Sequence, residues 1–312
     1  MSPSPIPFLP VNQTQIETLL NSARSNPYLP FSLHLYDNLA STNQTLWELG
    51  AVPGKVVIAT EQTAGRGQWG KNWVSNTGGL YLSVAVAPNL TATDSYQLTF
   101  ATAWGIAQQL RNCDIPVEIK WPNDLILDQL KLGGILTETK INQGKITQAV
   151  IGVGINWRNS VPDTGISLEL WRSHFCEKSH KCEKSHLSQK STQSSTNQIL
   201  EIETLICKVL LGIESGVRCL FEEGIDILLP SYLNYLTNMG DKVNVDNTVG
   251  TVVGVTSTGC LHVRMETSKS KSVRTPEIYL KPGTISLGYG NSTEKPMGYS
   301  QPNSANQTNS MN

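Results

Sequence analysis

The sequence predicts an α+β protein in which a larger mixed-sheet domain is followed by a small β barrel. From residue 35 to about residue 229, strand-like alternation is mixed with apolar residues that repeat at helical spacing. Residues 200–221 keep that spacing longest, so a long amphipathic helix is expected to close the larger domain. From residue 240 the pattern changes to short alternating strands broken by Asn247, Gly250 and Gly259, which predicts a barrel of about 45 residues.

The 312 residues therefore divide into four parts. We expect an N-terminal extension at 1–34, the mixed-sheet domain at 35–235, the barrel at 236–285 and a tail at 286–312. The tail consists mainly of Asn, Ser, Gly, Gln and Pro, which cannot supply a core, so disorder is predicted there. Within the larger domain, residues 172–198 are mostly Ser, Lys, Gln, Thr and His and predict a low-complexity insertion.

Individual elements follow from the same periodicities. One short helix is expected at residues 14–24, which leaves no room for a winged helix-turn-helix module of about 60 residues before the main domain. Another helix is expected at 97–112, and strands at 55–60, 79–86, 117–121 and 148–157. In the strand at 79–86, Leu80 and Leu82 alternate with Tyr81 and Ser83, so at least one face of this strand is buried.

Charge and hydropathy exclude several classes of protein. The net charge of −1 lacks the basic excess that binding to a phosphate backbone requires, so no nucleic-acid partner is expected. The sequence begins without a basic segment followed by an apolar one, and no stretch approaches the ~18 apolar residues of a membrane span. Cysteines outside the insertion are scattered without framework spacing, as is typical of reduced thiols. We therefore expect a soluble, cytoplasmic protein that does not bind membranes.

A repeated hexad inside the insertion resembles a metal-binding pattern. The segment FCEKSHKCEKSH brings together two cysteines and two histidines, namely Cys176, His180, Cys182 and His186. Their spacing matches no structural zinc finger that we can assign, and a zinc site needs a fixed geometry. We favour a duplicated loop without metal, with zinc binding as the alternative, and we expect deletion of 172–198 to change stability and activity little.

The segment TEQTAGRGQWGKNW at residues 60–73 carries glycines at the spacing G-x-G-x-x-G, which also occurs in dinucleotide-binding loops. That fingerprint requires a strand before it and a helix after it, because the pyrophosphate lies on the amides of the helix N-terminus. The strand at 55–60 meets the first requirement. The following KNWVSNTGGL is rich in Asn, Ser and Gly and fails the second, so we expect no nicotinamide or flavin site.

Three further motifs place a lysine or glycines within or at the end of apolar strands. In KWPNDL, strand alternation places Ile119 and Trp121 on the apolar face and Lys120 on the other, where a proline ends the strand. Lys120 is thus either a functional cation or a solvated lysine at a sheet edge. In KLGGIL, Gly133 and Gly134 allow the backbone to approach a ligand or a neighbouring strand closely, and GVGINW repeats this feature.

In this order, the motifs STNQ, GRGQWG, KWPNDL, KLGGIL and GINW resemble those of the biotin protein ligases. The resemblance runs from about residue 36 to residue 281, excludes the insertion and includes the barrel. It implies the mixed-sheet fold of biotin and lipoate ligases with an SH3-like barrel, in a short form without the N-terminal DNA-binding domain of some members. It also implies that biotin is activated with ATP and Mg²⁺ to biotinyl-5′-AMP and is then passed to one lysine of a carrier domain.

The resemblance assigns roles to individual residues. Lys120 falls on the lysine that bridges the biotin carboxylate and the phosphate, and Arg66 falls in the loop for nucleotide and biotin, so both are implied to be catalytic. The implied biotin-binding residues are Ser41, Thr42, Asn43, Gln62, Arg66, Gly67, Gln68 and Lys120. The implied nucleotide-binding residues are Gly65, Arg66, Gly67, Trp73, Asn123, Lys131 and Asn156, and no residue is implied as a metal ligand.

Several points stay open at this stage. The family's usual acceptor is the biotin carboxyl carrier subunit of acetyl-CoA carboxylase, but the sequence does not identify the carrier or distinguish a monomer from a homodimer. A lipoate-protein ligase or octanoyltransferase of the related fold is the nearest alternative. A biotin-binding or biotin-sensing regulator without activity is another, against which the presence of both Arg66 and Lys120 argues. Ser41 is also expected to cap a short helix that ends near Gly50.

One motif departs from the common family pattern. Many relatives carry GRGRRG, so Gln68 and Trp69 of GRGQWG replace two arginines, the first of which is associated with holding the adenylate. Glutamine keeps hydrogen-bonding groups but loses the bidentate, charge-assisted contact of a guanidinium with phosphate. The sequence therefore predicts weaker retention of biotinyl-AMP than in an arginine-containing relative.

Overall fold

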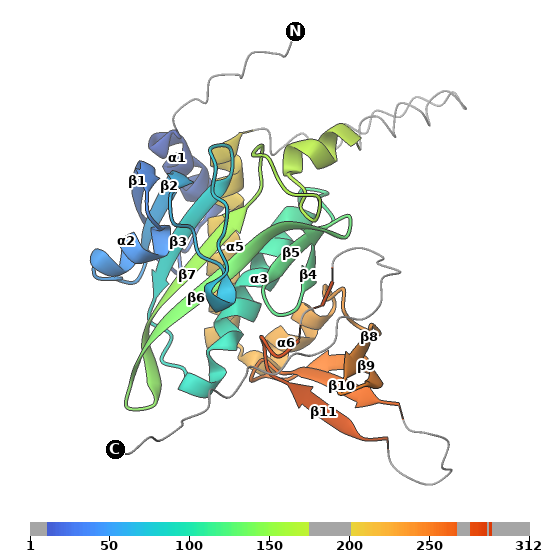
Figure 1. The fold of residues 1–312 in the computed structure, drawn as a ribbon. Coiled ribbons are helices and arrows are strands. Elements are labelled where there is room, and N and C mark those ends of the chain that lie inside the picture. Colours follow the sequence, from blue (N-terminus) through green and yellow to red (C-terminus); the bar gives the residue numbers. More distant parts are fainter. Residues whose placement is uncertain (1–10, 175–200, 267–274, 286, 289–312) are drawn as a thin grey trace, which may run out of the picture.

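The computed structural model describes residues 11–174, 201–266, 275–285 and 287–288 (Figure 1). Seven strands form a mixed sheet in the order β1-β2-β3-β7-β6-β5-β4. Strands β1 and β2 are parallel, and the other neighbours are antiparallel. The bounds are β1 Ser32–Leu39, β2 Lys55–Gln62, β3 Leu80–Val86, β4 Glu118–Lys120, β5 Asp124–Leu127, β6 Leu130–Asn142 and β7 Lys145–Ile155.

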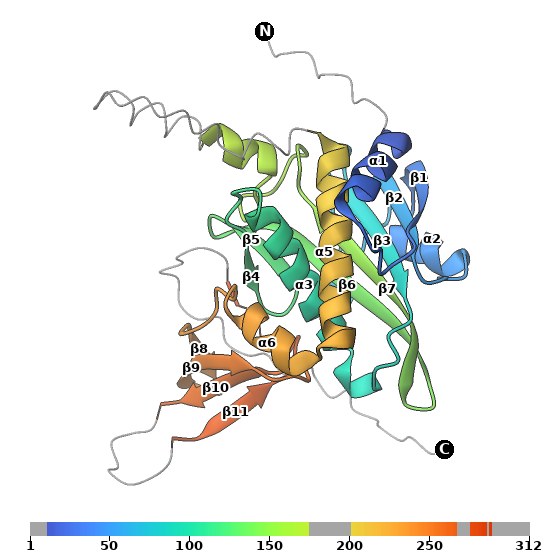
Figure 2. The ribbon, with the colours of Figure 1, turned by 180° about the vertical axis from the view of Figure 1, so that it is seen from behind.

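Helices cover the two faces of this sheet unequally. From behind, α3 and α5 lie across one face, with α6 beside them (Figure 2). The much smaller α2 lies on the opposite face, where its Leu46 packs with Val57, Ala85 and Val150 of three strands. The bounds are α1 Gln13–Ala23, α2 Thr42–Glu48, α3 Tyr96–Arg111, α5 Ile202–Glu222 and α6 Ile225–Leu233, with 3-10 turns η1 Gln68–Gly70 and η2 Ala92–Asp94.

The predicted α+β class is confirmed, and strand β3 shows how the sheet is packed. All seven residues of β3 are buried, so the strand is covered on both faces rather than on one. Leu82 and Val84 belong to the main core with α3 and α5, whereas Ala85 packs with α2. Because side chains alternate along a strand, Ser83 points to the same face as Ala85. A buried serine on the α2 face is the first indication of a polar site there.

A separate antiparallel sheet of four strands, in the order β11-β10-β9-β8, stands where the barrel was expected. Its strands are β8 Lys242–Val245, β9 Thr248–Val255, β10 Leu261–Met265 and β11 Glu277–Leu280. This sheet contacts the larger domain at Trp121, whose Nε1 donates to the carbonyl of Gly259 (2.9 Å). The backbone N–H of Trp121 also donates to Oδ1 of Asn238 (3.0 Å). The strand end that carries Lys120 is therefore fixed by hydrogen bonds from Trp121 to Asn238 and Gly259.

The N-terminal helix α1, expected at 14–24, is attached to α5. Buried Ile16 and Leu20 of α1 belong to the main core. After the helix, the backbone N–H groups of Tyr28 and Leu29 both donate to Oε1 of Glu214 in α5, at 2.8 Å each. The residues before β1 thus pack as part of the larger domain.

Parts of the sequence-based expectations lie outside the described residues. The insertion is described only at 172–174, which continue a helical segment that begins at residue 168. The cysteines and histidines of the repeated hexad, at 176–186, lie outside the described residues, as does nearly all of the tail expected at 286–312. Within the part of the chain that the structure describes, no helix is long and apolar enough to cross a membrane.

Candidate active site

One row of paired residues across the large sheet brings distant motifs together. Lys120 of β4 pairs with Asp124 of β5, Asp124 with Gly134 of β6, and Gly134 with Gly154 of β7. Residues that lie opposite one another on neighbouring strands point to the same face. KWPNDL, KLGGIL and GVGINW, which are separated in sequence, therefore meet on one face of the sheet.

Glycines on β7 form the floor of this face. Val150 packs with α2, so Gly152 and Gly154 lie on the same α2 face, two and four residues further along the strand. A Cβ at Gly152 would lie 2.3 Å from Oδ1 of Asn43, and a Cβ at Gly154 would lie 2.6 Å from Nε1 of Trp73. Glycine is needed at both positions so that Asn43 and Trp73 can lie directly on the strand.

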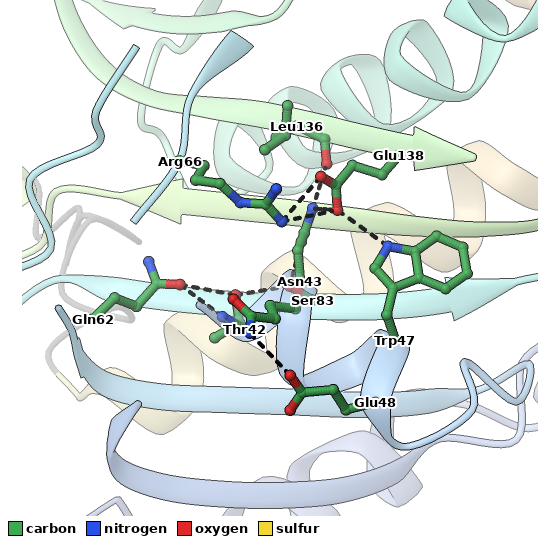
Figure 3. A network of polar contacts seen from close by, with 10 residues as sticks. Thr42, Asn43, Trp47, Glu48, Gln62, Arg66, Ser83, Leu136 and Glu138 are labelled. Carbon is green, nitrogen blue, oxygen red and sulfur yellow. Dashed lines mark hydrogen bonds and ion pairs between the residues drawn. The ribbon is translucent and has the colours of Figure 1, made fainter. Parts of the chain in front are cut away.

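Polar side chains form a connected network at one end of this floor (Figure 3). The backbone N–H of Thr42 donates to Oε1 of Gln62 (2.8 Å), and Nε2 of Gln62 donates to Oγ of Ser75 (2.8 Å). The hydroxyl of Ser83 lies 2.8 Å from Oγ1 of Thr42 and 2.6 Å from Oδ1 of Asn43. Hydroxyl and amide groups from α2, β2 and β3 are thus fixed in one place before any ligand arrives.

Ser41 lies at the start of this network. It is buried and occupies the N-cap position of α2, but its side chain makes no capping hydrogen bond. The expected helix after Ser41 is confirmed, whereas the expected capping by its hydroxyl is wrong.

Glu138 of β6 joins the network and was not predicted from the sequence (Figure 3). Its Oε2 accepts from Nδ2 of Asn43 (3.0 Å) and from Nε1 of Trp47 (3.1 Å). A guanidinium nitrogen of Arg66 lies 3.0 Å from its Oε1. Strand alternation places Glu138 on the same face as Gly134. Glu138 lies two residues after the motif KLGGIL, and nothing in that motif predicts that Glu138 contacts Asn43 or Arg66.

The glycine-rich loop is a narrow hairpin that crosses the front of the sheet in Figure 1. Isolated bridges join Gln62 to Ser75 and Arg66 to Asn72. As the sequence predicted, no long helix follows the glycines, because the loop holds only the 3-10 turn η1. The amide of Gly67, one of the implied biotin- and nucleotide-binding residues, donates to the carbonyl of Lys71 within the loop (2.7 Å).

Close packing at Gly65 and at Trp69 shapes the loop. A Cβ at Gly65 would lie 2.4 Å from Oγ of Ser75, so this glycine allows the two arms of the hairpin to meet. Trp69 has a positive φ of 60° and is 61 % exposed. A Cβ at Gly283 would lie 2.8 Å from its ring, so Trp69 packs on the segment that follows β11. Gln68, beside it, begins the 3-10 turn.

Lys120 is buried, with 5 % of its surface exposed. The alternative of a solvated edge lysine is therefore wrong. The reason is that the outer edge of β4 is covered by residues 235–237. The backbone N–H of Ile119 donates to the carbonyl of Tyr235 (2.7 Å), and that of Thr237 donates to the carbonyl of Ile119 (2.8 Å). Nζ of Lys120 donates to the carbonyl of Leu287, which shows that an acceptor oxygen fits beside the ammonium group.

Burial lowers the pKa of Lys120 to about 8, although the neighbouring Asp124 raises it in part. Asp124 also forms an ion pair with Lys131, with 2.7 Å between Oδ1 and Nζ. Nζ of Lys131 lies 5.3 Å from the ring centroid of Trp73. Lys120, Lys131 and Trp73 therefore surround one end of the glycine floor, opposite the network around Asn43.

Two of the implied nucleotide-binding residues support the backbone. Nδ2 of Asn123 donates to the carbonyl of Ile135 (2.8 Å), which joins the turn between β4 and β5 to β6. Nδ2 of Asn156 lies 3.3 Å from the carbonyl of Lys131, and its Oδ1 accepts from Asn159 (3.0 Å). In this structure both asparagines hold the strands that carry the site.

The fold and this face together define a mixed-sheet domain with a cationic end and an amide-rich end on one surface. Residues 36–156 match the model of the Biotin/lipoate A/B protein ligase family.

Individual proteins are similar to this chain over part of their length. The chain is 36 % identical over 136 residues to the bifunctional ligase/repressor BirA of Bacillus subtilis, which covers 41 % of this chain and 42 % of that protein. It is 34 % identical over 112 residues to a biotin–acetyl-CoA-carboxylase ligase of Paracoccus denitrificans, covering 35 % of this chain and 46 % of the relative. The chain thus spans less than half the length of either relative.

A solved structure supports the fold independently of these matches. The biotin protein ligase from Aquifex aeolicus in complex with biotin and ATP superposes with a TM-score of 0.55 at 22 % identity. The match covers 80 % of this chain and 99 % of that one. The mixed sheet and the separate C-terminal sheet are therefore the fold of a biotin protein ligase.

Proposed function

We propose that the protein is an AMP-forming biotin ligase that makes biotinyl-5′-AMP and transfers biotin to a lysine of a carboxyl carrier domain. One observation carries the proposal: the buried ammonium group of Lys120 and the polar network around Asn43 lie on the same glycine-floored face. Biotin has a carboxylate at one end and a ureido ring at the other. The relatives named above support the same reaction, with the acetyl-CoA carboxylase subunit as the proposed carrier.

The residues present fit the two substrates. The hydroxyls of Thr42 and Ser83 and the amide of Gln62 supply donors and acceptors for a ureido ring. At the other end, Nε1 of Trp73 is buried and has no acceptor among the described residues, so a ligand oxygen would satisfy it. Lys120 and Lys131 supply positive charge for a carboxylate and for phosphates.

We propose that ATP is used with Mg²⁺, which supplies charge neutralisation at the phosphates when bound. Within the described residues, no three acidic, histidine or cysteine side chains form a metal cluster. This fits a Mg²⁺ that is held mainly by substrate phosphates and water, with one carboxylate at most from the protein. Asp124, 8 % exposed beside Lys120, is the nearest candidate for that carboxylate.

The chemistry then follows in two balanced steps. A carboxylate oxygen of biotin attacks the α-phosphorus of ATP, the bond to the β-phosphate breaks, and pyrophosphate leaves. The amine of the carrier lysine next attacks the acyl carbon, an amide forms, AMP leaves, and the amine loses a proton. Lys120 remains protonated and holds the two approaching anions together, so its role is electrostatic positioning.

The direct test of this proposal is pyrophosphate release on mixing the protein with ATP and biotin, followed by transfer of labelled biotin to a carboxyl carrier domain. We expect release with biotin and little with lipoate, because the Thr42–Gln62–Ser83 network offers polar groups that lipoate's dithiolane ring does not use. Release with lipoate alone would favour a lipoate ligase. Biotin binding without pyrophosphate release would favour a regulator. The four described cysteines are free thiols, which fits a proposed cytoplasmic location.

The lowered pKa of Lys120 predicts how binding depends on pH. The ammonium form attracts the biotin carboxylate, and it is the form below a pKa of about 8. As pH rises from about 7 to about 9, most of the charge is lost and biotin binding should weaken about tenfold. Calorimetry of wild type and Lys120→Arg checks this, because a guanidinium keeps its charge in that range and should flatten the dependence. An equally steep profile in Lys120→Arg would assign the titration to another group.

A further inference from the structure

Glu138 lies outside the five sequence motifs, yet its carboxylate contacts residues of two of them. Its carboxylate receives three donors from two elements: Asn43 and Trp47 of α2, and Arg66 of the glycine-rich loop (Figure 3). Its side chain is 25 % exposed and that of Arg66 is 47 % exposed. The pair thus lies at the rim of the site, where water and a ligand both have access.

Arg66 is directed to Glu138 in this structure. Its terminal nitrogen lies 3.0 Å from Oε1 and 3.3 Å from Oε2 of Glu138. A guanidinium that is paired with a protein carboxylate has fewer N–H groups and less net charge to offer to a ligand oxyanion. If Arg66 acts on the acyl-adenylate, as the proposed function requires, an arriving oxyanion competes with Glu138 for it.

Glu138 can lose this partner at little cost. After Arg66 leaves, Oε2 still accepts from Nδ2 of Asn43 and Nε1 of Trp47, so the carboxylate is not left without donors. The same contact fixes the amide of Asn43. Its Nδ2 donates to Glu138 and lies 3.3 Å from the carbonyl of Leu136, which directs Oδ1 to Ser83.

We propose that Glu138 is a positioning residue that holds Arg66 at the rim of the site before substrate binds and releases it to an oxyanion of the substrate, while it keeps the amide of Asn43 in its binding orientation. This inference rests on the proposed function. The oxyanion is either the carboxylate of biotin or a phosphate of ATP, since both carry the charge that a guanidinium binds.

The test is the substitution Glu138→Gln, which removes the competing charge and keeps an acceptor oxygen. Dissociation constants are measured by calorimetry for biotin and for the neutral biotinamide. If Glu138 competes for Arg66, the preference for biotin over biotinamide should rise about two- to fivefold. The ratio removes any effect on the ring end, because both ligands share it. A second arm measures ATP with biotinamide bound, and a gain confined to that arm would identify phosphate as the oxyanion.

A double variant and a control variant show whether the gain comes from the release of Arg66. With Arg66→Ala, the further change Glu138→Gln should give no gain, since there is no guanidinium to release. Glu48→Gln, which removes an exposed carboxylate of α2 that contacts only Gln44 among the described residues, should leave the ratio unchanged.

An unchanged preference in both arms, or a gain that persists with Arg66→Ala, would overturn the assignment of Glu138. Purely structural damage would weaken both ligands equally and leave the ratio at its wild-type value, which also counts against it. Wild-type protein that binds neither biotin nor ATP would instead contradict the proposed function. The two failures are therefore distinguishable in one set of titrations.

Discussion

Replacing Lys120 by alanine is expected to leave a folded protein that scarcely forms biotinyl-AMP. Lys120 is 5 % exposed and so has no role as a surface charge. Burial already disfavours its charged form, as the lowered pKa shows, so its removal should not destabilise the fold. The adenylation rate should fall by about 10²- to 10³-fold, the usual effect of removing one preorganised electrostatic group.

Single-turnover formation of biotinyl-AMP measures this effect, with circular dichroism as the check on folding. Lys120→Met is the companion variant, because it keeps an unbranched side chain of similar length in the buried slot. Lys145→Ala removes an exposed lysine from the start of β7, at the opposite end of the strand from Gly154, and should retain the wild-type rate. Adenylate formation by Lys120→Met at close to the wild-type rate would show that the cation is not required.

The sequence predicted those elements whose pattern reflects burial. Residues 97–112 and 200–221 became α3 and α5, which bury one continuous face against the sheet. Strand β1 was not predicted, because it lies at the sheet edge and only Leu33 of its eight residues is buried. An edge strand that is mostly exposed has no alternation for a sequence pattern to show.

Site residues that belong to sequence motifs could be predicted. Site residues that join the others only because their strands are neighbours in the sheet could not. Lys120 and Asn43 belong to such motifs, but the burial of Lys120 depends on backbone bonds from residues 235–237, over a hundred positions away. Ser83 and Glu138 enter the site only because β3, β7 and β6 are neighbours. A single buried serine in the apolar run LYLSVAV was a usable signal for Ser83. Glu138 gave no comparable signal, since an alternating strand edge accommodates a glutamate without any ligand.

The replacement of arginine by Gln68 is expected to make adenylate retention weak, and Gln68→Arg should slow the release of biotinyl-AMP. A guanidinium would add a bidentate, charge-assisted contact to the phosphate that is worth about 1 to 3 kcal/mol more than an amide contact. This corresponds to about ten- to hundredfold slower release. Gln68 begins the 3-10 turn at the tip of the hairpin and is not buried, so a longer side chain is tolerated there.

The size of the effect of Gln68→Arg on adenylate release depends on Trp69. Its ring packs on Gly283, so the loop is already tied to the segment after β11 without an arginine. If this contact only orders the loop, Gln68→Arg adds phosphate affinity in full, and release of preformed adenylate without acceptor slows at constant ionic strength. Gln68→Met, which has similar length and no charge, should not slow release. Equal rates for wild type and Gln68→Arg would mean that packing of Trp69 on Gly283 already retains the adenylate, because a closed loop blocks its exit whether or not a guanidinium holds the phosphate.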